Sequence, residues 1–81
     1  MDWTVYILRC SDNSLYTGIT RDLNRRIIEH NNDNRLAAAY TRARRPVTLV
    51  YQEAQIDRSS ASKREAVIKK MTKAEKEKLI K

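Results

Sequence analysis

The sequence predicts a single α+β domain over residues 1–81, with its elements in the order ββα(α)βαα. Segments rich in β-branched and aromatic residues stand near the start and the middle of the chain, and amphipathic stretches typical of helices separate and follow them. A length of 81 residues is enough for one hydrophobic core and too short for two. One glycine and one proline are too few for a many-turned all-β sandwich or barrel.

The first two predicted strands form a hairpin. Residues 3–10 and 15–20 favour strands, and the turn-forming run 11–14 separates them. A two-residue turn would scatter the apolar side chains over both faces, whereas a loop with an odd number of residues would gather them on one. We therefore choose the odd loop. It places Trp3, Val5, Ile7, Leu15 and Ile19 on one face and Tyr6, Leu8, Cys10, Tyr16 and Gly18 on the other.

The middle of the chain predicts a helix, a short helix and a strand. Residues 22–32 form the first helix, with Asp22 as its N-cap or first-turn acid and an apolar stripe at i, i+4 spacing. Residues 35–41 predict a short second helix. Residues 47–53 alternate between apolar and polar side chains, which predicts the third strand.

Two further helices are predicted at the C-terminal end. Ser59 or Ser60 can cap a helix that runs as far as Lys70. Thr72, followed three residues later by Glu75, matches a capping box and predicts the start of the last helix.

The chain is strongly basic. Lysine and arginine total 17 against 10 aspartate and glutamate residues, which gives a net charge of +7. This balance favours a polyanionic partner such as nucleic acid, and a merely solvated basic surface is the alternative. The run of Arg42, Arg44 and Arg45 predicts a surface that contacts a phosphate backbone.

The cysteine count and the hydropathy pattern limit the compartment. Cys10 is the only cysteine, which excludes an internal disulfide framework and a cysteine zinc cluster and fits a reducing environment. We expect Cys10 to be a small buried residue and assign it no role. No apolar run is long enough to span a membrane, and the N-terminus lacks the pattern of a signal peptide. We therefore expect a cytoplasmic protein that does not enter membranes.

Two tyrosines and the single glycine are candidates on one face of the hairpin. Tyr6 and Tyr16 can together bind phosphate, or one of them can act as a general base if its pKa is lowered. The ordinary alternative is that both rings pack and their hydroxyls reach water. Gly18 lies inside a predicted strand, where glycine indicates a close approach by a ligand or a backbone, or else a bulge.

Arg26 and His30 lie one helical turn apart and border the apolar stripe of the first predicted helix. An arginine beside an imidazole suits phosphate binding, and the alternative is a solvated arginine next to a half-buried histidine. His30 is the only histidine, so a multi-histidine metal site is excluded.

Glu65 lies at the edge of the apolar face of the helix predicted to end near Lys70. A carboxylate there is a candidate ligand for a hard divalent cation, and an ion pair with Arg26 or another base is equally open. The sequence contains no glycine-rich phosphate loop, no G-x-S-x-G elbow and no H-E-x-x-H pattern. Serine-hydrolase and P-loop chemistry are therefore not supported.

Taken together, these residues resemble the pattern of the GIY-YIG nuclease superfamily, especially its small stand-alone bacterial members. The resemblance covers nearly the whole chain. It rests on Thr4-Val5-Tyr6, Tyr16-Thr17-Gly18, Arg26, His30 and Glu65, and on the stretch from Tyr40 to Val47.

The resemblance implies a three-stranded antiparallel sheet flanked by helices, and hydrolysis of DNA phosphodiester bonds with one divalent metal, which we expect to be Mg²⁺. Tyr6 would be the general base or position the attacking water, and Tyr16 would support it and orient the phosphate. Arg26 would stabilise charge on the phosphoryl oxygens, and His30 would assist near the phosphate or in proton transfer. Glu65 would hold the metal. A tyrosine base needs a pKa well below about 10, which a nearby cation can provide.

The chain also departs from the family pattern. Thr4 stands where the family has its first glycine, and Thr17 replaces the isoleucine of the second triplet. No asparagine follows Asn34, so the asparagine that many family nucleases carry beyond the glutamate is missing. Two other functions stay open: a non-catalytic nucleic-acid-binding module of the same fold, and an interaction domain whose activity needs a protein partner. The filled site positions favour the nuclease.

Overall fold

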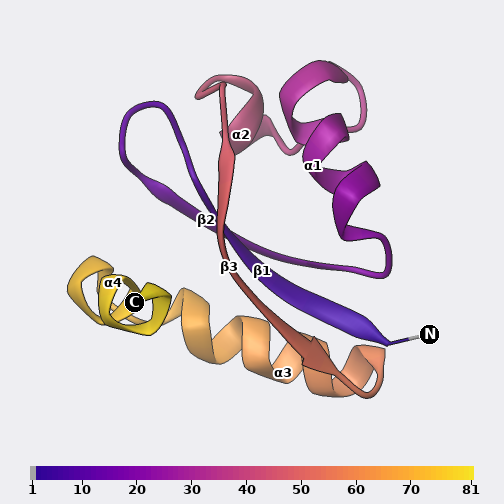
Figure 1. Ribbon diagram of the computed structural model, residues 1–81, viewed down its shortest axis with the longest axis vertical. Coiled ribbons are helices and arrows are strands. Elements are labelled where there is room, and N and C mark those ends of the chain that lie inside the picture. The colour runs from indigo at the N-terminus through magenta and orange to yellow at the C-terminus, as the bar shows by residue number, and fades with distance from the viewer. Residues whose placement is uncertain (1) are drawn as a thin grey trace.

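The structure, a computed structural model that describes residues 2–81, contains one antiparallel sheet with the strand order β2-β1-β3 (Figure 1). The α+β class and the order of the elements are confirmed. Within residues 2–81, no helix has the length and apolar character needed to cross a membrane. The elements are β1 (Trp3–Arg9), β2 (Leu15–Thr20), α1 (Leu23–Asn32), α2 (Ala39–Arg42), β3 (Thr48–Gln55), α3 (Arg58–Lys69) and α4 (Lys73–Ile80).

Helices cover both faces of the sheet. In Figure 1, α1 and α2 lie on one side of the strands, and α3 and α4 lie on the other. Each side has its own core, and the central strand β1 contributes to both. The core beneath α3 and α4 contains Val5, Ile7, Ala61 and Ile68, and the core beneath α1 contains Tyr6, Leu8, Cys10 and Val47.

The hairpin has the predicted register. Val5 lies opposite Ile19, and Tyr6 lies opposite Gly18, so odd positions pair with odd and even with even. The connecting loop, residues 10–14, has an odd number of residues, as expected. Asn13 in this loop has a φ of 69°, a left-handed conformation that asparagine adopts more readily than most residues. The two predicted sets of side chains are therefore on opposite faces.

The helix predicted at 35–41 is shorter and begins later, at 39–42. The carboxylate of Asp33 accepts hydrogen bonds from the backbone N–H groups of Arg35, at 2.8 Å, and Leu36, at 2.9 Å. A side chain that satisfies these donors offers the backbone a turn in place of a helix. The third strand is also longer than predicted and ends at Gln55.

The caps of the helices confirm two predictions and correct one. Asp22 caps α1, and Thr72 forms a capping box with Glu75 at the start of α4, both as predicted. The N-cap of α3 is Asp57 rather than Ser59 or Ser60: its carboxylate accepts from the backbone N–H of Ser60 at 2.8 Å. A carboxylate also carries a negative charge that interacts favourably with the positive end of the helix dipole, whereas a serine hydroxyl is uncharged.

Candidate active site

The ring of Tyr6 crosses over the neighbouring strand at Gly18. A Cβ atom built on Gly18 would lie 2.5 Å from the Tyr6 hydroxyl oxygen and 2.6 Å from the ring carbon that bears it. No positive φ is found at Gly18, so the missing side chain matters for space and not for backbone freedom. The close approach at Gly18 is therefore made by a side chain and not by the ligand or backbone that the sequence indicated, and it gives the Tyr6 hydroxyl room above β2.

The Tyr6 hydroxyl meets His30, which α1 holds above the sheet. The distance between Tyr6 Oη and His30 Nε2 is 2.9 Å, and His30 is fully buried. The Tyr16 ring packs edge-on against the imidazole, with 5.3 Å between ring centres. The structure thus brings three of the predicted site residues together, and His30 is completely buried rather than half-buried.

The pKa of Tyr6 is raised to about 12. Burial is the main cause and the proximity of Tyr16 adds to it, while the guanidinium of Arg26 acts in the opposite direction. The lowered pKa that a tyrosine base needs is therefore not supplied by the protein's own groups. Tyr6 keeps its proton at neutral pH and can donate it in a hydrogen bond.

The pKa of His30 is lowered to about 4. Burial is again the main cause, and the positive charges of Arg26 and Arg45 add to it. The imidazole is therefore neutral at neutral pH, with one ring nitrogen available as a hydrogen-bond acceptor. In this pair Tyr6 can donate a proton and His30 can accept it.

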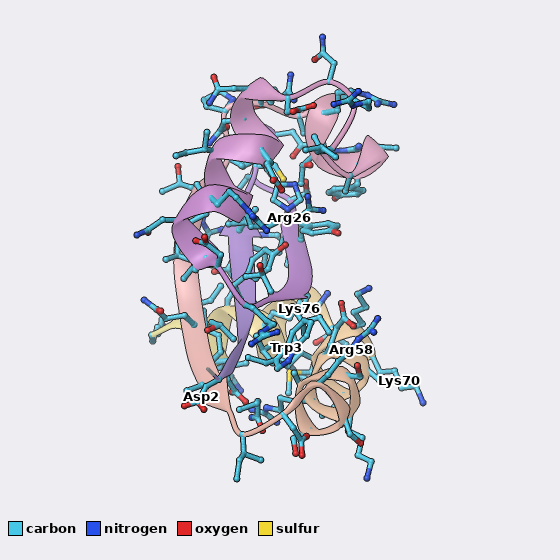
Figure 2. The ribbon with its side chains drawn as sticks, turned by 90° about the vertical axis from the view of Figure 1, so that its right-hand side faces the viewer. Asp2, Trp3, Arg26, Arg58, Lys70 and Lys76 are labelled. Atoms are coloured by element: carbon cyan, nitrogen blue, oxygen red, sulfur yellow. The ribbon has the colours of Figure 1, made fainter. Side chains whose placement is uncertain are left out.

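Arg26 places a positive charge beside this pair. Its Nη1 atom donates to Glu29 Oε1 at 3.0 Å and to the backbone carbonyl of Leu36 at 2.8 Å. Figure 2 shows the Arg26 side chain extending from α1 on the side of the strands. About a quarter of the side chain, 26%, is exposed, so the guanidinium is anchored but still within reach of a ligand in solvent.

Glu65 comes from α3, which packs against β1 and β2 from the opposite face of the sheet. Its negative charge is the smallest of the influences that raise the pKa of Tyr6. It pairs with Lys69 at 3.3 Å, one turn along the same helix, and not with Arg26. The Lys69 side chain is 53% exposed, so this ion pair is weak and readily exchanged.

Most of the other carboxylates stabilise the fold through ion pairs or helix caps. Ion pairs with arginine or hydrogen bonds to a helix N-terminus engage Asp12, Asp22, Glu29, Glu53, Asp57, Glu75 and Glu77. Glu65 differs because its partner is an exposed lysine. In the described part of the chain, no group of three or more histidine, cysteine or acidic side chains could enclose a metal. A cation at Glu65 would therefore draw its other ligands from water and from a phosphate, as Mg²⁺ commonly does.

The predicted basic run has internal partners. Arg45 donates from Nε to the His30 carbonyl at 2.7 Å and from Nη2 to the Asp33 carbonyl at 3.0 Å, which satisfies acceptors at the end of α1. Arg42 and Arg44 also donate to backbone carbonyl oxygens. These arginines hold the segment between α1 and β3, and their contact with nucleic acid stays a prediction.

Sequence reasoning missed two residues beside the site. Thr41 is fully buried and its hydroxyl oxygen lies 2.7 Å from His30 Nδ1. Tyr40 stacks on Tyr16 with 6.0 Å between ring centres, and the Arg44 guanidinium lies 3.9 Å from the centre of the Tyr40 ring. The sequence shows Tyr40 and Thr41 next to a basic run, but no pattern in it indicates that the Thr41 side chain is buried.

A cavity of about 350 Å³ lies away from this cluster, on β3, where it is lined by Leu49, Val50, Tyr51 and Gln52. It coincides with the irregular pairing between β3 and β1, where Ile7 faces Tyr51 and Leu8 faces Leu49. The tyrosine and histidine cluster does not line this cavity, which therefore carries no part of the candidate active site.

Comparison with known proteins gives the cluster a context. The family model of the GIY-YIG catalytic domain matches residues 2–78. The chain is 54% identical over 79 residues to a UPF0213 protein of Desulfotalea psychrophila, which covers 98% of this chain and 71% of that protein. It is 53% identical over 76 residues to a UPF0213 protein of Staphylococcus epidermidis, which covers 94% of this chain and 90% of that one.

Two solved structures have the same fold. The solution NMR structure of a UPF0213 protein from Bacillus halodurans has a TM-score of 0.62 at 40% identity and covers 99% of this chain and 83% of its own. That of a protein from E. faecalis has a TM-score of 0.67 at 39% identity, with 96% and 81% covered. The match to the family model and the identity to these relatives show that the chain belongs to the GIY-YIG catalytic domain family.

Proposed function

We propose that this protein is a metal-dependent endonuclease that hydrolyses phosphodiester bonds in DNA. The observation that carries the proposal is the buried tyrosine–histidine pair with the anchored guanidinium of Arg26 beside it. Glu65 on α3, whose ion-pair partner is an exposed lysine, supplies a candidate carboxylate for the metal. Membership of a family that typically contains nucleases supports it. The net charge of +7 suits a polyanionic substrate.

Tyr6 and His30 would remove a proton from the attacking water. As the water oxygen bonds to phosphorus, its proton passes to Tyr6 Oη while the tyrosine proton passes to His30 Nε2, 2.9 Å away. The P–O bond to the leaving group breaks, and the leaving oxygen takes a proton from solvent. Because both transfers occur together, Tyr6 never has to exist as a free phenolate, which its raised pKa would disfavour.

Arg26 would bind the phosphate, and the bound phosphate would in turn make His30 a better base. A guanidinium donates two parallel hydrogen bonds to phosphate oxygens and favours the charge that builds on them during attack. The charge of Arg26 is one cause of the low pKa of His30. A phosphate bound to Arg26 would offset that charge, so the imidazole would accept a proton more readily when substrate is present.

Glu65 is the residue that would hold the divalent cation, and Tyr16 would orient the phosphate from β2. The Glu65 carboxylate fits a hard cation because it is the acid near Tyr6 whose ion-pair partner is an exposed lysine. When bound, Mg²⁺ would supply positive charge beside the phosphate and make the phosphorus atom more susceptible to attack.

The test is cleavage of labelled duplex, single-stranded, nicked and branched DNA, with and without Mg²⁺. We expect Glu65→Gln and Tyr6→Phe to reduce the rate by about 10²- to 10⁴-fold. Lys69→Gln is the matched control, because it removes the ion pair on α3 but leaves the carboxylate, and it should cleave at close to the wild-type rate.

Equal losses in Glu65→Gln and Lys69→Gln would mean that Glu65 serves the helix and not a metal. Absence of cleavage by the wild type, with salt-sensitive DNA binding retained, would replace the nuclease with a binding module. Absence of both would favour an interaction domain that depends on a protein partner.

A further inference from the structure

A continuous chain of hydrogen bonds runs through the interior from β1 to α2. Tyr6 Oη lies 2.9 Å from His30 Nε2, and His30 Nδ1 lies 2.7 Å from Thr41 Oγ1. The Thr41 hydroxyl in turn donates to the Ala38 carbonyl oxygen at 3.0 Å. The side chains of Tyr6, His30 and Thr41 are all exposed by 1% or less, so water cannot readily replace any of these bonds.

The proton positions along this chain follow from its last member. In the bond between Thr41 and the Ala38 carbonyl the hydroxyl is the donor, because a carbonyl can only accept, and this bond uses the single hydroxyl proton. The Thr41 oxygen therefore accepts from His30, which places the imidazole hydrogen on Nδ1. A neutral imidazole carries one such hydrogen, so Nε2 has a free lone pair and accepts from the Tyr6 hydroxyl. Every bond in the chain is oriented the same way.

We propose that Thr41 is a positioning residue that holds His30 in the Nδ1–H tautomer and so leaves Nε2 free to take the proton of Tyr6. In the opposite tautomer, Nε2 would carry a hydrogen and would face the tyrosine oxygen as a donor. Tyr6 would then have no acceptor for its proton and could not take one from water. This catalytic role of Thr41 rests on the nuclease function proposed above.

Thr41 also suits the charged state of His30. When the imidazole accepts a second proton at Nε2, its Nδ1–H still points at the Thr41 oxygen, and no donor is left unpaired. The same threonine therefore accepts from His30 before and after proton transfer. It comes from α2, which packs against α1, so α2 holds the Nδ1 side of the imidazole while Tyr6 of β1 holds the Nε2 side.

The tautomer can be measured without any assay of activity. His30 is the only histidine, so the ¹⁵N signals of the imidazole in labelled protein need no assignment. For the wild type near neutral pH we expect a protonated Nδ1 and an unprotonated Nε2. Thr41→Val keeps the shape of the side chain but removes the oxygen, and it should shift the hydrogen largely to Nε2. Thr41→Ser keeps the hydroxyl and should retain the wild-type pattern.

Two results would overturn the assignment: an Nε2–H tautomer in the wild type, or an unchanged Nδ1–H signal in a folded Thr41→Val variant. Amide NMR spectra check that both variants are folded. Should Thr41→Val fail to fold, Thr41→Ala, which also lacks the hydroxyl, takes its place, and the wild-type spectrum decides the tautomer by itself.

The kinetic consequence is measured separately. Thr41→Val should reduce kcat by about 10- to 100-fold, as is typical when a hydrogen-bond partner that orients a functional histidine is lost. KM for DNA should stay close to that of the wild type, and Thr41→Ser should restore most of the rate. A changed tautomer with an unchanged kcat would overturn the catalytic role of Thr41. The expected tautomers in a wild type that cleaves no DNA would instead refute the nuclease function and leave the positioning of His30 by Thr41 intact.

Discussion

The two faces of the sheet share their strands but differ in what they bury. Beneath α3 and α4 the fully buried side chains include Ile7 and Ile68, which have no polar atoms. Beneath α1 and α2 they include Tyr6, His30 and Thr41, whose polar atoms bond to one another. A buried polar group costs free energy unless each of its partners is present, whereas buried hydrocarbon stabilises without such conditions. We infer that the apolar face carries the stability of the fold and that the polar face carries its proton-transfer chemistry, with Glu65 reaching the site from α3.

The largest expected effect on stability comes from the apolar face. Ile68→Ala should lower the free energy of unfolding by about 3 kcal/mol, because it opens a cavity between α3 and β1. Denaturant unfolding at low temperature measures the loss, and Ile68→Val should cost only about 1 kcal/mol. Below the unfolding transition, both variants should cleave DNA at near the wild-type rate per folded molecule.

Gly18→Ala is the counterpart on the polar face and should lower stability and activity together. Its methyl group would collide with the Tyr6 ring, at a cost of about 1–3 kcal/mol in stability. The displaced hydroxyl would lose His30, so the rate should fall as far as in Tyr6→Phe. Ile68→Ala abolishing the activity of folded protein, or Gly18→Ala leaving it intact, would contradict the division between the faces.

The second effect is a loss of stability in weak acid that comes from His30. Its pKa in the folded protein is about 4, below the ordinary value of 6.5, so between these pH values the unfolded chain binds a proton that the folded protein does not. Stability is therefore fully present above pH 6.5 and is lost as the pH falls towards 4, by up to about 1.4 kcal/mol per pH unit.

The control for this prediction is His30→Gln, which has no titrating group at this position. Asp12 and Glu53 have lowered pKa values in the folded protein, and aspartate and glutamate ordinarily titrate near pH 4. The stability that these carboxylates contribute is therefore lost mainly below pH 4, outside the range measured for His30. Urea unfolding at several pH values between 4 and 7 should show a steeper slope for the wild type than for His30→Gln. Parallel slopes would mean that the folded protein accommodates a charged imidazole.

Much of this division between faces could be predicted from the sequence. The strand period is two, so one choice of loop parity assigns every side chain of the hairpin to a face, and that choice placed Tyr6 and Gly18 on the same face. The helical period likewise put Arg26 and His30 on the same side of α1. The strand and helix periods depend only on residues close together in the chain, so they can be recognised in the sequence alone.

Other features depend on contacts that no local pattern displays. Thr41 belongs to a helix of four residues, too short for a periodic signal, and its burial depends on α1 packing against it. The raised pKa of Tyr6 results from total burial outweighing the charge of Arg26, a balance that needs three-dimensional positions. The metal at Glu65 and the DNA contacts of the arginine run stay predictions.

The smallest expected effect tests the two faces with the same chemical change. Thr17 lies on the side of the sheet that α3 covers, and within residues 2–81 its buried hydroxyl oxygen has no hydrogen-bond partner. Thr17→Val removes that unsatisfied group while keeping the shape of the side chain, so it should stabilise the fold by about 1 kcal/mol. Thr41→Val makes the same change where the hydroxyl has two partners and should destabilise the fold by about 1–3 kcal/mol. Thermal unfolding of both variants measures the two signs side by side. Shifts of the same sign would show that the hydroxyl environments are alike, and the distinction between an apolar and a polar face would then not extend to these threonines.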